Sequence, residues 1–237
     1  MNEKALSSLT IFFPCYDDQK TISGLVLSAD RLGKELTGEY EILVVDDGSS
    51  DGSREALVDL QRKVPKLRLI FHHGNQGYGA VLKSGFHHAS RDWIFYTDGD
   101  GQYDPSDLKE LAAQALDETD VVNGYKVRRR DPLYRVLIGE IYRNIARVFF
   151  RIPIRDVNCD FRLIRREVLN RVHLSRRSGA IGIELIAKLE RAGCRFSERP
   201  VRHYPRPYGR SKFFSPRHLL RTGGDLLWLW REVRHGV

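Results

Sequence analysis

The sequence predicts an α/β fold with a mostly parallel central sheet, helices on both faces and an amphipathic helix at the C-terminal end. In residues 1–125, short apolar runs rich in β-branched and aromatic residues alternate with helical stretches, the pattern of a parallel sheet covered on both faces. A chain of 237 residues can bury one substantial core. We therefore expect one domain over residues 1–215, and a helix at 216–237 that lies on a membrane surface or packs on the domain.

The first half contains four predicted buried strands, each a short apolar run, at residues 8–14, 40–47, 66–73 and 92–98. Helices are predicted between them at residues 18–36, 51–63 and 78–89. Ser50 or Asp51 is the expected N-cap of the second helix. Three of the strands run into the polar clusters PCYDD, DDGSSDG and DGDGQYDP. Because ligands collect at the carboxyl ends of parallel strands, we expect these clusters to form one site.

The second half is less regular than the first. Its predicted elements are a helix at about 132–151, a polar stretch at 156–163, a helix at 181–192, a strand at 195–203 and a last helix after Pro216. No linker separates it from the first half, so both halves are expected to share one fold.

Composition excludes several classes of protein. Hydrophobic residues make up 41% and charged residues 30% of the chain, which is ordinary for a globular domain and excludes disorder. Its three cysteines are an odd number without CxxC spacing, so neither a disulfide framework nor a structural zinc site is expected. The N-terminal segment lacks the features of a signal peptide. We expect a cytoplasmic protein.

The charge is divided unevenly along the chain. Residues 1–125 contain 12 Lys and Arg against 21 Asp and Glu, a net charge of −9, whereas residues 126–237 contain 27 against 10, a net charge of +17. A basic half is compatible with nucleic acid, an anionic membrane or a phosphorylated substrate. No nucleic-acid-binding module accompanies the charge, so nucleic acid is not an expected partner.

Two helices carry much of this basic charge. The helix at 132–151 has a basic face formed by Arg143, Arg147 and Arg151, with isoleucines, a valine and a phenylalanine on another face. The helix after Pro216 has an apolar stripe of Leu219, Leu220, Leu226, Leu227, Trp230 and Val233, flanked by Arg217, Arg221, Arg231 and Arg234. No apolar run reaches the roughly 18 residues that span a bilayer. We expect the chain to lie peripherally on the cytoplasmic face of an anionic membrane, although helix 132–151 equally fits ordinary packing on the sheet.

The segment DGDGQ, residues 98–102, offers a metal site at the end of the apolar run WIFYT. Two carboxylates and an amide oxygen at alternating positions are hard ligands suited to Mg²⁺ or Mn²⁺. An EF-hand is disfavoured, because Tyr103 and Lys109 stand where its glycine and glutamate belong. The predicted metal ligands are Asp98, Asp100 and Gln102.

Two further loops are candidates for binding a nucleotide. Asp46 and Asp47 follow the run ILVV and can accept hydrogen bonds from a base or a ribose, or belong merely to a good turn. The stretch GNQGYG, which includes Asn75 and Gly77, precedes a helix and can cradle phosphate with its backbone N–H groups.

Together and in order, these segments resemble glycosyltransferase family 2, the inverting enzymes of the GT-A fold. PCYDD, VVDDGSSDG, GNQGYGAVLKSGF and TDGDGQYDP each match a segment of that family, and the resemblance runs from Phe12 to Lys212. It implies a GT-A fold, a nucleotide-sugar donor and a divalent metal. The donor contacts that it implies are Pro14, Tyr16, Asp18, Asp46 and Asp47. Asp18 replaces the usual glutamate, and Asp160 stands where a small residue is common.

Within that family, the chain is most similar to the polyprenyl-phosphate sugar transferases. DGDGQYDP, DVNCDFRLIRREVL and RPYGRSKF carry this closer likeness. It implies that a hexose passes from a GDP- or UDP-sugar to polyprenyl phosphate. The acceptor or diphosphate contacts that it implies are Arg129, Asp156, Arg162, Arg206 and Lys212.

The expected catalytic residues are Asp98, Asp100 and Asp156. A phosphate monoester needs no general base, because its second pKa is about 6; Asp156 then orients the acceptor, and it becomes the candidate base if the acceptor is a hydroxyl. Three alternatives stay open: a family 2 transferase with a soluble, polymer or protein acceptor, a nucleotidyltransferase, and a non-enzymatic binding subunit.

Overall fold

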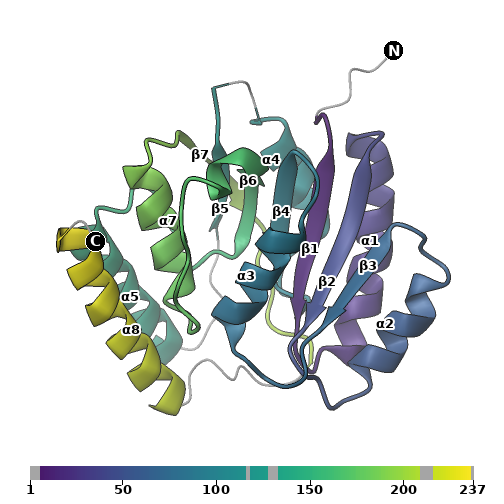
Figure 1. Cartoon of the computed structure of the whole chain (residues 1–237), viewed down its shortest axis with the longest axis horizontal. Helices are drawn as coiled ribbons and strands as arrows, with labels where there is room; N and C mark the ends of the chain where they lie inside the picture. The colour runs from purple at the N-terminus through teal and green to yellow at the C-terminus, as the bar shows by residue number, and fades with distance from the viewer. Residues whose placement is uncertain (1–5, 116–117, 128–132, 209–215, 236–237) are drawn as a thin grey trace.

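The computed structural model describes residues 6–115, 118–127, 133–208 and 216–235 (Figure 1). Its strands are β1 (Leu9–Cys15), β2 (Tyr40–Asp46), β3 (Leu67–Phe71), β4 (Trp93–Thr97), β5 (Val121–Lys126), β6 (Phe161–Arg165) and β7 (Phe196–Val201). They form one sheet in the order β3-β2-β1-β4-β6-β5-β7. The predicted mostly parallel sheet is confirmed, because only β6 runs antiparallel to its neighbours.

The helices are α1 (Gln19–Leu36), α2 (Ser53–Gln61), α3 (Tyr78–His88), α4 (Leu108–Ala112), α5 (Leu133–Phe150), α6 (Arg166–Leu169), α7 (Ile181–Arg191) and α8 (Pro216–His235), with a 3₁₀ turn at Pro105–Asp107. Helices α1, α2 and α4 pack on one face of the sheet, and α3 and α7 pack on the other. The predicted coverage of both faces is therefore confirmed.

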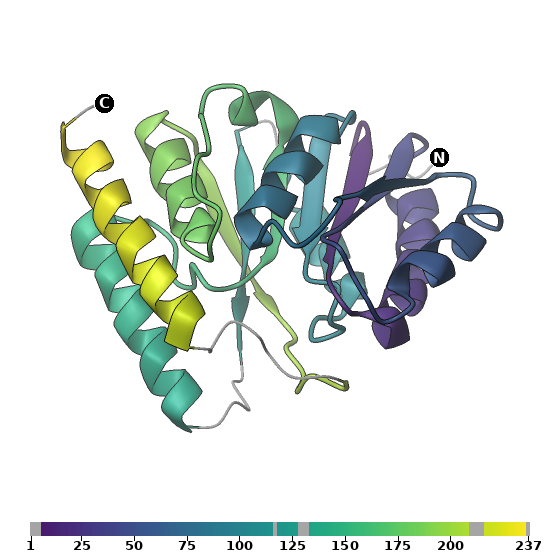
Figure 2. The same cartoon turned by 60° about the horizontal axis from the view of Figure 1, so that its bottom comes forward.

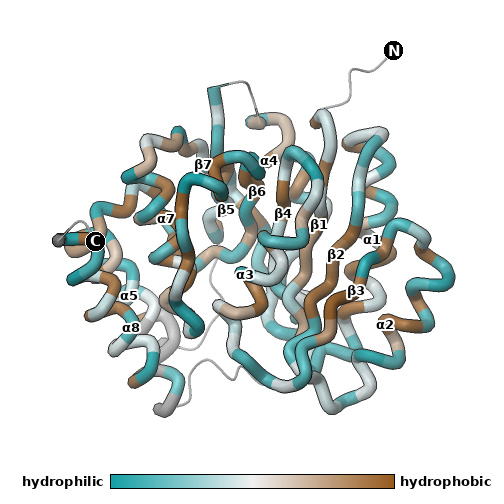
Figure 3. The backbone as a smooth tube through the Cα atoms, viewed as in Figure 1, coloured by the Kyte–Doolittle hydropathy of each residue, from teal (hydrophilic) through white to brown (hydrophobic). Residues whose placement is uncertain are grey.

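The centre of the sheet is the most apolar part of the molecule. Every residue of β1, β2 and β4 is buried, which explains their nearly continuous runs of Val, Ile, Leu and Phe. Figure 3 shows the contrast between the hydrophobic β2 and the hydrophilic loops at the carboxyl ends of the neighbouring strands. Apolar burial thus fixes the strands, and the polar loops lie where the burial ends.

The sequence reading missed two strands, β5 at the end of the first half and β6 in the second half. β6 lies within and just after the predicted polar stretch 156–163, and it inserts between β4 and β5. It pairs antiparallel with β4, with Thr97 opposite Phe161. The expected N-cap of α2 was also wrong: the cap is Gly52, in a left-handed conformation with φ 87°, and the Asp51 carboxylate instead accepts the Ser53 N–H at 3.1 Å.

Helices α5, α7 and α8 enclose a third apolar cluster at one end of the sheet. Ala146 and Phe150 of α5 pack there with Leu226, Leu229 and Val233 of α8, and Figure 2 shows α5 and α8 side by side beyond α7. The expected C-terminal amphipathic helix is present, but its predicted stripe is divided, because Leu220 and Leu227 lie on the exposed side. None of the helices in the described part of the chain is long and apolar enough to span a membrane.

Candidate active site

The loops after β1, β2 and β4 meet at one edge of the sheet, as predicted. Cys15 at the end of β1 pairs with Asp46 at the end of β2. Thr21 Oγ1 donates a 2.7 Å hydrogen bond to the Gly99 carbonyl in the loop after β4. A Cβ at Gly99 would lie 2.6 Å from the Pro14 carbonyl and 3.3 Å from Asp18 Oδ2. Only glycine allows these loops to approach so closely.

The loop after β1 is tied to the loop after β2. Asp17 has φ 56°, a left-handed conformation uncommon outside glycine. Its N–H donates to Ser49 Oγ at 2.9 Å, and its Oδ1 accepts the Ser50 N–H at 2.8 Å. Strained backbone held in this way is typical of functional sites.

Asp18 faces the acidic loop after β4. Its Oδ2 accepts the Tyr16 N–H at 3.2 Å. Burial raises the pKa of Asp18 to about 6; the Tyr16 N–H opposes this shift, and the negative charge of Asp100 adds to it. The predicted donor residues Pro14, Tyr16 and Asp18 therefore lie beside the predicted metal ligands.

Asp46 is completely buried at the end of β2. Its Oδ1 accepts hydrogen bonds from the Gly48 N–H at 3.1 Å, the Ser49 N–H at 3.2 Å and Arg54 Nε at 2.5 Å. Its Oδ2 is buried and has no hydrogen-bond partner among the described residues. A buried oxygen without a partner needs an explanation, such as a ligand that supplies one.

Asp47 holds the glycine-rich loop. Its two oxygens accept the N–H groups of Gln76 and Gly77, both at 2.9 Å, and Oδ1 lies 2.7 Å from His72 Nδ1. Both oxygens of Asp47 thus contact the protein. Asn75, on this loop, is exposed.

Two carboxylates stand opposite each other where β4 ends and β6 begins. Because Thr97 pairs with Phe161 in antiparallel register, Asp98 and Asp160 are the next cross-strand positions. The Tyr78 hydroxyl donates to Asp98 Oδ1 at 2.8 Å. Burial raises the pKa of Asp160, and the Tyr78 hydroxyl lies close enough to that carboxyl to oppose the shift. Burial and the charges of Asp160 and Asp100 raise the pKa of Asp98 well above its ordinary value. This concentration of negative charge is compatible with a bound cation.

A guanidinium already neutralises the second carboxylate of the acidic loop. Arg206 Nη2 lies 2.6 Å from Asp100 Oδ2, and Asp100 is largely buried. Gln102 donates through Nε2 to the Tyr204 carbonyl at 3.1 Å, so its amide oxygen remains an acceptor. The donor set of Asp98, Asp100 and Gln102 therefore fits a hard divalent cation; within the described ranges no cluster of three or more His, Cys, Asp and Glu side chains is arranged to bind a metal.

Arg162 and Asp156 lie deeper than the other predicted residues. The Arg162 side chain is fully buried and donates to Asn123 Oδ1 at 2.6 Å and Asp160 Oδ1 at 3.0 Å, and also to Tyr96 and Val157. Asp156 is 5% exposed, and its Oδ1 accepts the Asn158 N–H at 3.2 Å. Arg162 is thus engaged with protein groups, whereas Arg129 and Lys212 lie outside the described residues.

Comparison with known proteins identifies the family. Residues 10–172 match the model of Glycosyl transferase family 2, which is more than half of the chain. The chain belongs to glycosyltransferase family 2. It is therefore a glycosyltransferase, and its fold is the GT-A fold.

Solved structures share the fold of this glycosyltransferase. It is similar to a mannosyltransferase from Pyrobaculum calidifontis in complex with GDP-Man and Mn²⁺, with a TM-score of 0.66 and 20% identity, over 95% of this chain and 66% of that one. It is also similar to a glucosyl-3-phosphoglycerate synthase from Mycobacterium tuberculosis in complex with Mn²⁺, UDP and phosphoglyceric acid, with a TM-score of 0.66 and 17% identity, over 97% of this chain and 76% of that one. The chain spans about two thirds of the mannosyltransferase.

Two residues of the glycosyltransferase site were not singled out from the sequence, namely Arg54, which donates to Asp46, and Tyr78, which donates to Asp98. His72 also supports the site, because it joins Asp47 to Ser84. Tyr78 lies within the glycine-rich stretch GNQGYG, so its position was the available signal. The partners of Arg54 and His72 depend on how β2 and β3 pack against their helices, which the sequence motifs do not specify.

Proposed function

We propose that this glycosyltransferase moves a hexose, with inversion, from a GDP- or UDP-sugar to polyprenyl phosphate at the cytoplasmic surface of an anionic membrane. The observation that carries the proposal is the acidic loop after β4, where Asp98 lies near Asp100 and Asp100 pairs with Arg206. Such a site can hold a cation, a diphosphate and an attacking phosphate close together, because it combines two carboxylates with a guanidinium.

In this proposal, Asp98, Asp100 and Gln102 hold Mg²⁺ or Mn²⁺. The ion would neutralise charge on the diphosphate leaving group as a Lewis acid. Mn²⁺ is present in the two similar structures named above. Tyr78 orients Asp98 through its 2.8 Å hydrogen bond, and Arg206 grips phosphate oxygens once it leaves Asp100.

The donor nucleoside binds between the loops after β1 and β2. Pro14, Tyr16 and Asp18 line this position on one side, and Asp46 offers an oxygen that has no partner within the described residues. Asp47 acts indirectly, because it fixes the N–H groups of the glycine-rich loop around Asn75 and Gly77.

The proposed acceptor is a lipid because of the outer surface of α5 and α8. Leu137, Ile141 and Val148 of α5 and Leu220, Leu227 and Trp228 of α8 are all more than half exposed. Arg221, Arg231 and Arg234 lie among the exposed residues of α8. Apolar and basic side chains on one helix favour an anionic membrane surface. Asp156 orients the acceptor, Arg162 supports the site through Asp160, and Arg129 and Lys212 are proposed phosphate contacts on the family resemblance.

A soluble acceptor is the second candidate. It is supported by the similar synthase structure, which contains phosphoglyceric acid. Such an acceptor has a hydroxyl to activate, and Asp156 would then be the candidate base.

The Asp100→Ala variant tests the proposed site. Asp100 lies in the loop after β4, so the variant should fold. It should not release nucleoside diphosphate from any nucleotide-sugar donor. A screen of GDP- and UDP-sugars with polyprenyl phosphate and with phosphoglycerate separates the two acceptors. Near-native turnover by Asp100→Ala, or full activity of the unaltered enzyme in EDTA, would contradict the metal assignment.

A further inference from the structure

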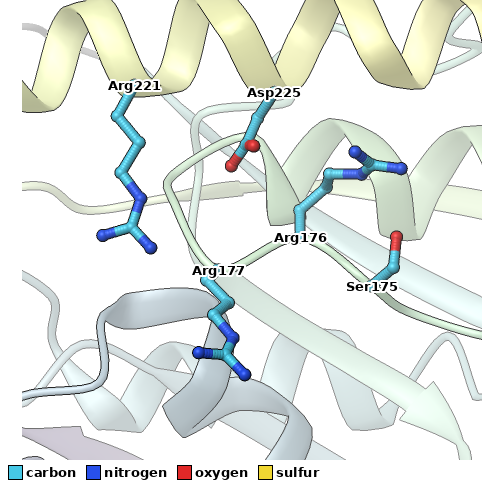
Figure 4. A pocket seen from close by; sticks show the side chains of 5 residues that line it. All are labelled: Ser175, Arg176, Arg177, Arg221 and Asp225. Carbon is cyan, nitrogen blue, oxygen red and sulfur yellow. The ribbon is translucent and has the colours of Figure 1, made fainter.

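A cleft of about 260 Å³ lies between α8 and the segment before α7, and the family motifs do not include it. It is lined by Ser175, Arg176 and Arg177 of the segment and by Arg221 and Asp225 of α8. Figure 4 shows Arg221 and Asp225 reaching from α8 toward the segment, whereas the Arg177 side chain extends away from α8 and Arg176 turns its guanidinium away from Arg221. The three arginines that line the cleft outnumber its one carboxylate, which makes the cleft a candidate for an anionic ligand.

The segment that forms one wall of the cleft is firmly held. The buried Glu184 carboxylate accepts the N–H groups of Ser175 and Arg176, both at 2.9 Å, and Ser175 Oγ at 2.8 Å. On its other side, the Arg177 carbonyl accepts the Gly79 N–H at 3.0 Å. The wall is therefore preorganised, which lowers the cost of binding a ligand.

Two of the arginines keep their charge available. Arg176 is neutralised by Glu232, at 2.5 Å. Arg177 and Arg221 are exposed, and neither forms an ion pair within 4.0 Å with a residue that the structure describes. Guanidiniums bind phosphate oxygens through paired hydrogen bonds. Asp225 would repel a bare anion but can accept a hydrogen bond from a hydroxyl, so a phosphate ester that carries a hydroxyl suits the cleft.

The surroundings of the cleft indicate where such a phosphate comes from. Trp228 lies two helical turns after Arg221, on the same side of α8, and its side chain is 63% exposed. Leu220, next to Arg221, is 79% exposed. Tryptophan is enriched at the membrane–water interface. We propose that the cleft binds the headgroup of an anionic phospholipid, with Arg177 and Arg221 on its phosphate and Asp225 on a headgroup hydroxyl.

This inference rests on the proposed membrane association but not on the identity of the acceptor. It is tested with dihexanoyl phosphatidylglycerol below its micelle concentration, titrated into the full chain and followed by calorimetry. The test variant is Arg177→Ala/Arg221→Ala. The matched control is Arg62→Ala/Arg191→Ala, which removes two exposed arginines, one after α2 and one on α7, that lie outside the cleft and outside α5 and α8.

The unaltered protein and the control should bind the lipid equally, and the test variant should bind it at least about tenfold more weakly, the loss expected for removing about 1.4 kcal/mol of binding free energy. Asp225→Ala, which removes the acceptor, should abolish the preference for phosphatidylglycerol over phosphatidic acid, which lacks the headgroup hydroxyl. Equal losses in control and test variant would overturn the proposal, and equally tight binding of glycerol 1-phosphate would show a soluble ligand instead.

Transfer to polyprenyl phosphate in detergent micelles separates this inference from the proposed function. The test variant should keep the rate of the unaltered enzyme, because the cleft residues do not contact the acidic loop. A loss of transfer in the test variant alone would make the cleft the acceptor site and overturn the headgroup assignment. Lipid binding without transfer by the unaltered protein would sustain the inference while contradicting the proposed acceptor.

Discussion

Arg206 and Asp100 form an ion pair between residues 106 positions apart in the sequence, and this pair competes with any cation that binds Asp100. Arg206→Ala should therefore raise the affinity for Mn²⁺. The same variant should lower transfer roughly ten- to a thousandfold, because the lost guanidinium stabilises the reacting phosphates by about 1.4 to 4 kcal/mol. Mn²⁺ titration followed by electron paramagnetic resonance, together with kcat/KM, measures both effects.

Arg202→Ala is the matched control for this prediction. Arg202 lies four residues earlier and pairs with Asp107 at 2.6 Å and with Asp104 at 2.9 Å, and its ion pairs with described residues do not include Asp98 or Asp100. It should leave metal affinity and transfer unchanged. Unchanged Mn²⁺ affinity in Arg206→Ala would show that the ion pair does not compete with the metal.

At the residue scale, the sequence indicated where the acidic loop lies, but it did not indicate which side chains pack against that loop. The place of Asp98, Asp100 and Gln102 in the loop after β4 was predictable, because this segment directly follows an apolar run. The cross-strand position of Asp160 opposite Asp98 could not be predicted, because it depends on the register of β6 against β4. That register follows from packing across the whole sheet. The burial of Arg162 has the same origin, because its partners come from β4, β5 and the loop before β6.

At the scale of elements, Glu184 anchors α7 to the segment before it. The side chain is completely buried and lies 2.9 Å from Lys188. Glu184→Ala should lower the free energy of unfolding by about 3 to 5 kcal/mol, because it leaves buried cationic and N–H groups without their partner. Urea unfolding measures this loss, and Glu190→Ala on the exposed side of the same helix is the control.

The contribution of Glu184 should also depend on pH. Burial raises its pKa, but hydrogen bonds from Lys188, Arg176 and Ser175 outweigh burial and hold the pKa below its usual value. The stabilisation is therefore fully present above the ordinary glutamate pKa of about 4.3 and is lost as the pH falls through the lower folded value. Between pH 7 and pH 3, the unaltered protein should lose more stability than Glu184→Gln does. Equal losses would contradict this assignment.

The missed strands also belong to the scale of elements. β5 has the sequence VVNGYK and β6 has the sequence FRLIR. Asparagine, glycine and arginine interrupt the apolar pattern that identified β1, β2 and β4. In the fold, Arg162 Nε donates a 2.6 Å hydrogen bond to Asn123 Oδ1. This contact between distant parts of the sequence allows two polar side chains to be buried in strands where the local sequence disfavours burial.

At the scale of the whole molecule, the exposed apolar face of α8 should decide membrane binding. Deleting α8 is not a clean test, because Leu226, Leu229 and Val233 belong to the third core cluster. Leu220→Ser/Leu227→Ser removes only exposed groups and should weaken flotation with anionic vesicles several-fold without changing thermal stability. The control is Leu27→Ser/Val58→Ser, which removes two exposed apolar side chains from α1 and α2. Equal flotation of both double variants would place the membrane contact elsewhere.

The insertion of β6 between β4 and β5 sets the order in which the site can be completed during synthesis. The parallel strands β1 to β4 emerge from the ribosome first, as part of residues 1–125, whose net charge is −9. Asp98 gains its cross-strand neighbour, and Asp100 its arginine, only after residues 160 and 206 have been made. A nascent chain that stops short of these residues has an acidic sheet edge with neither its antiparallel partner nor its countercharge. Ribosome-bound chains of increasing length should therefore become protease-resistant at β4 only once β6 has left the exit tunnel.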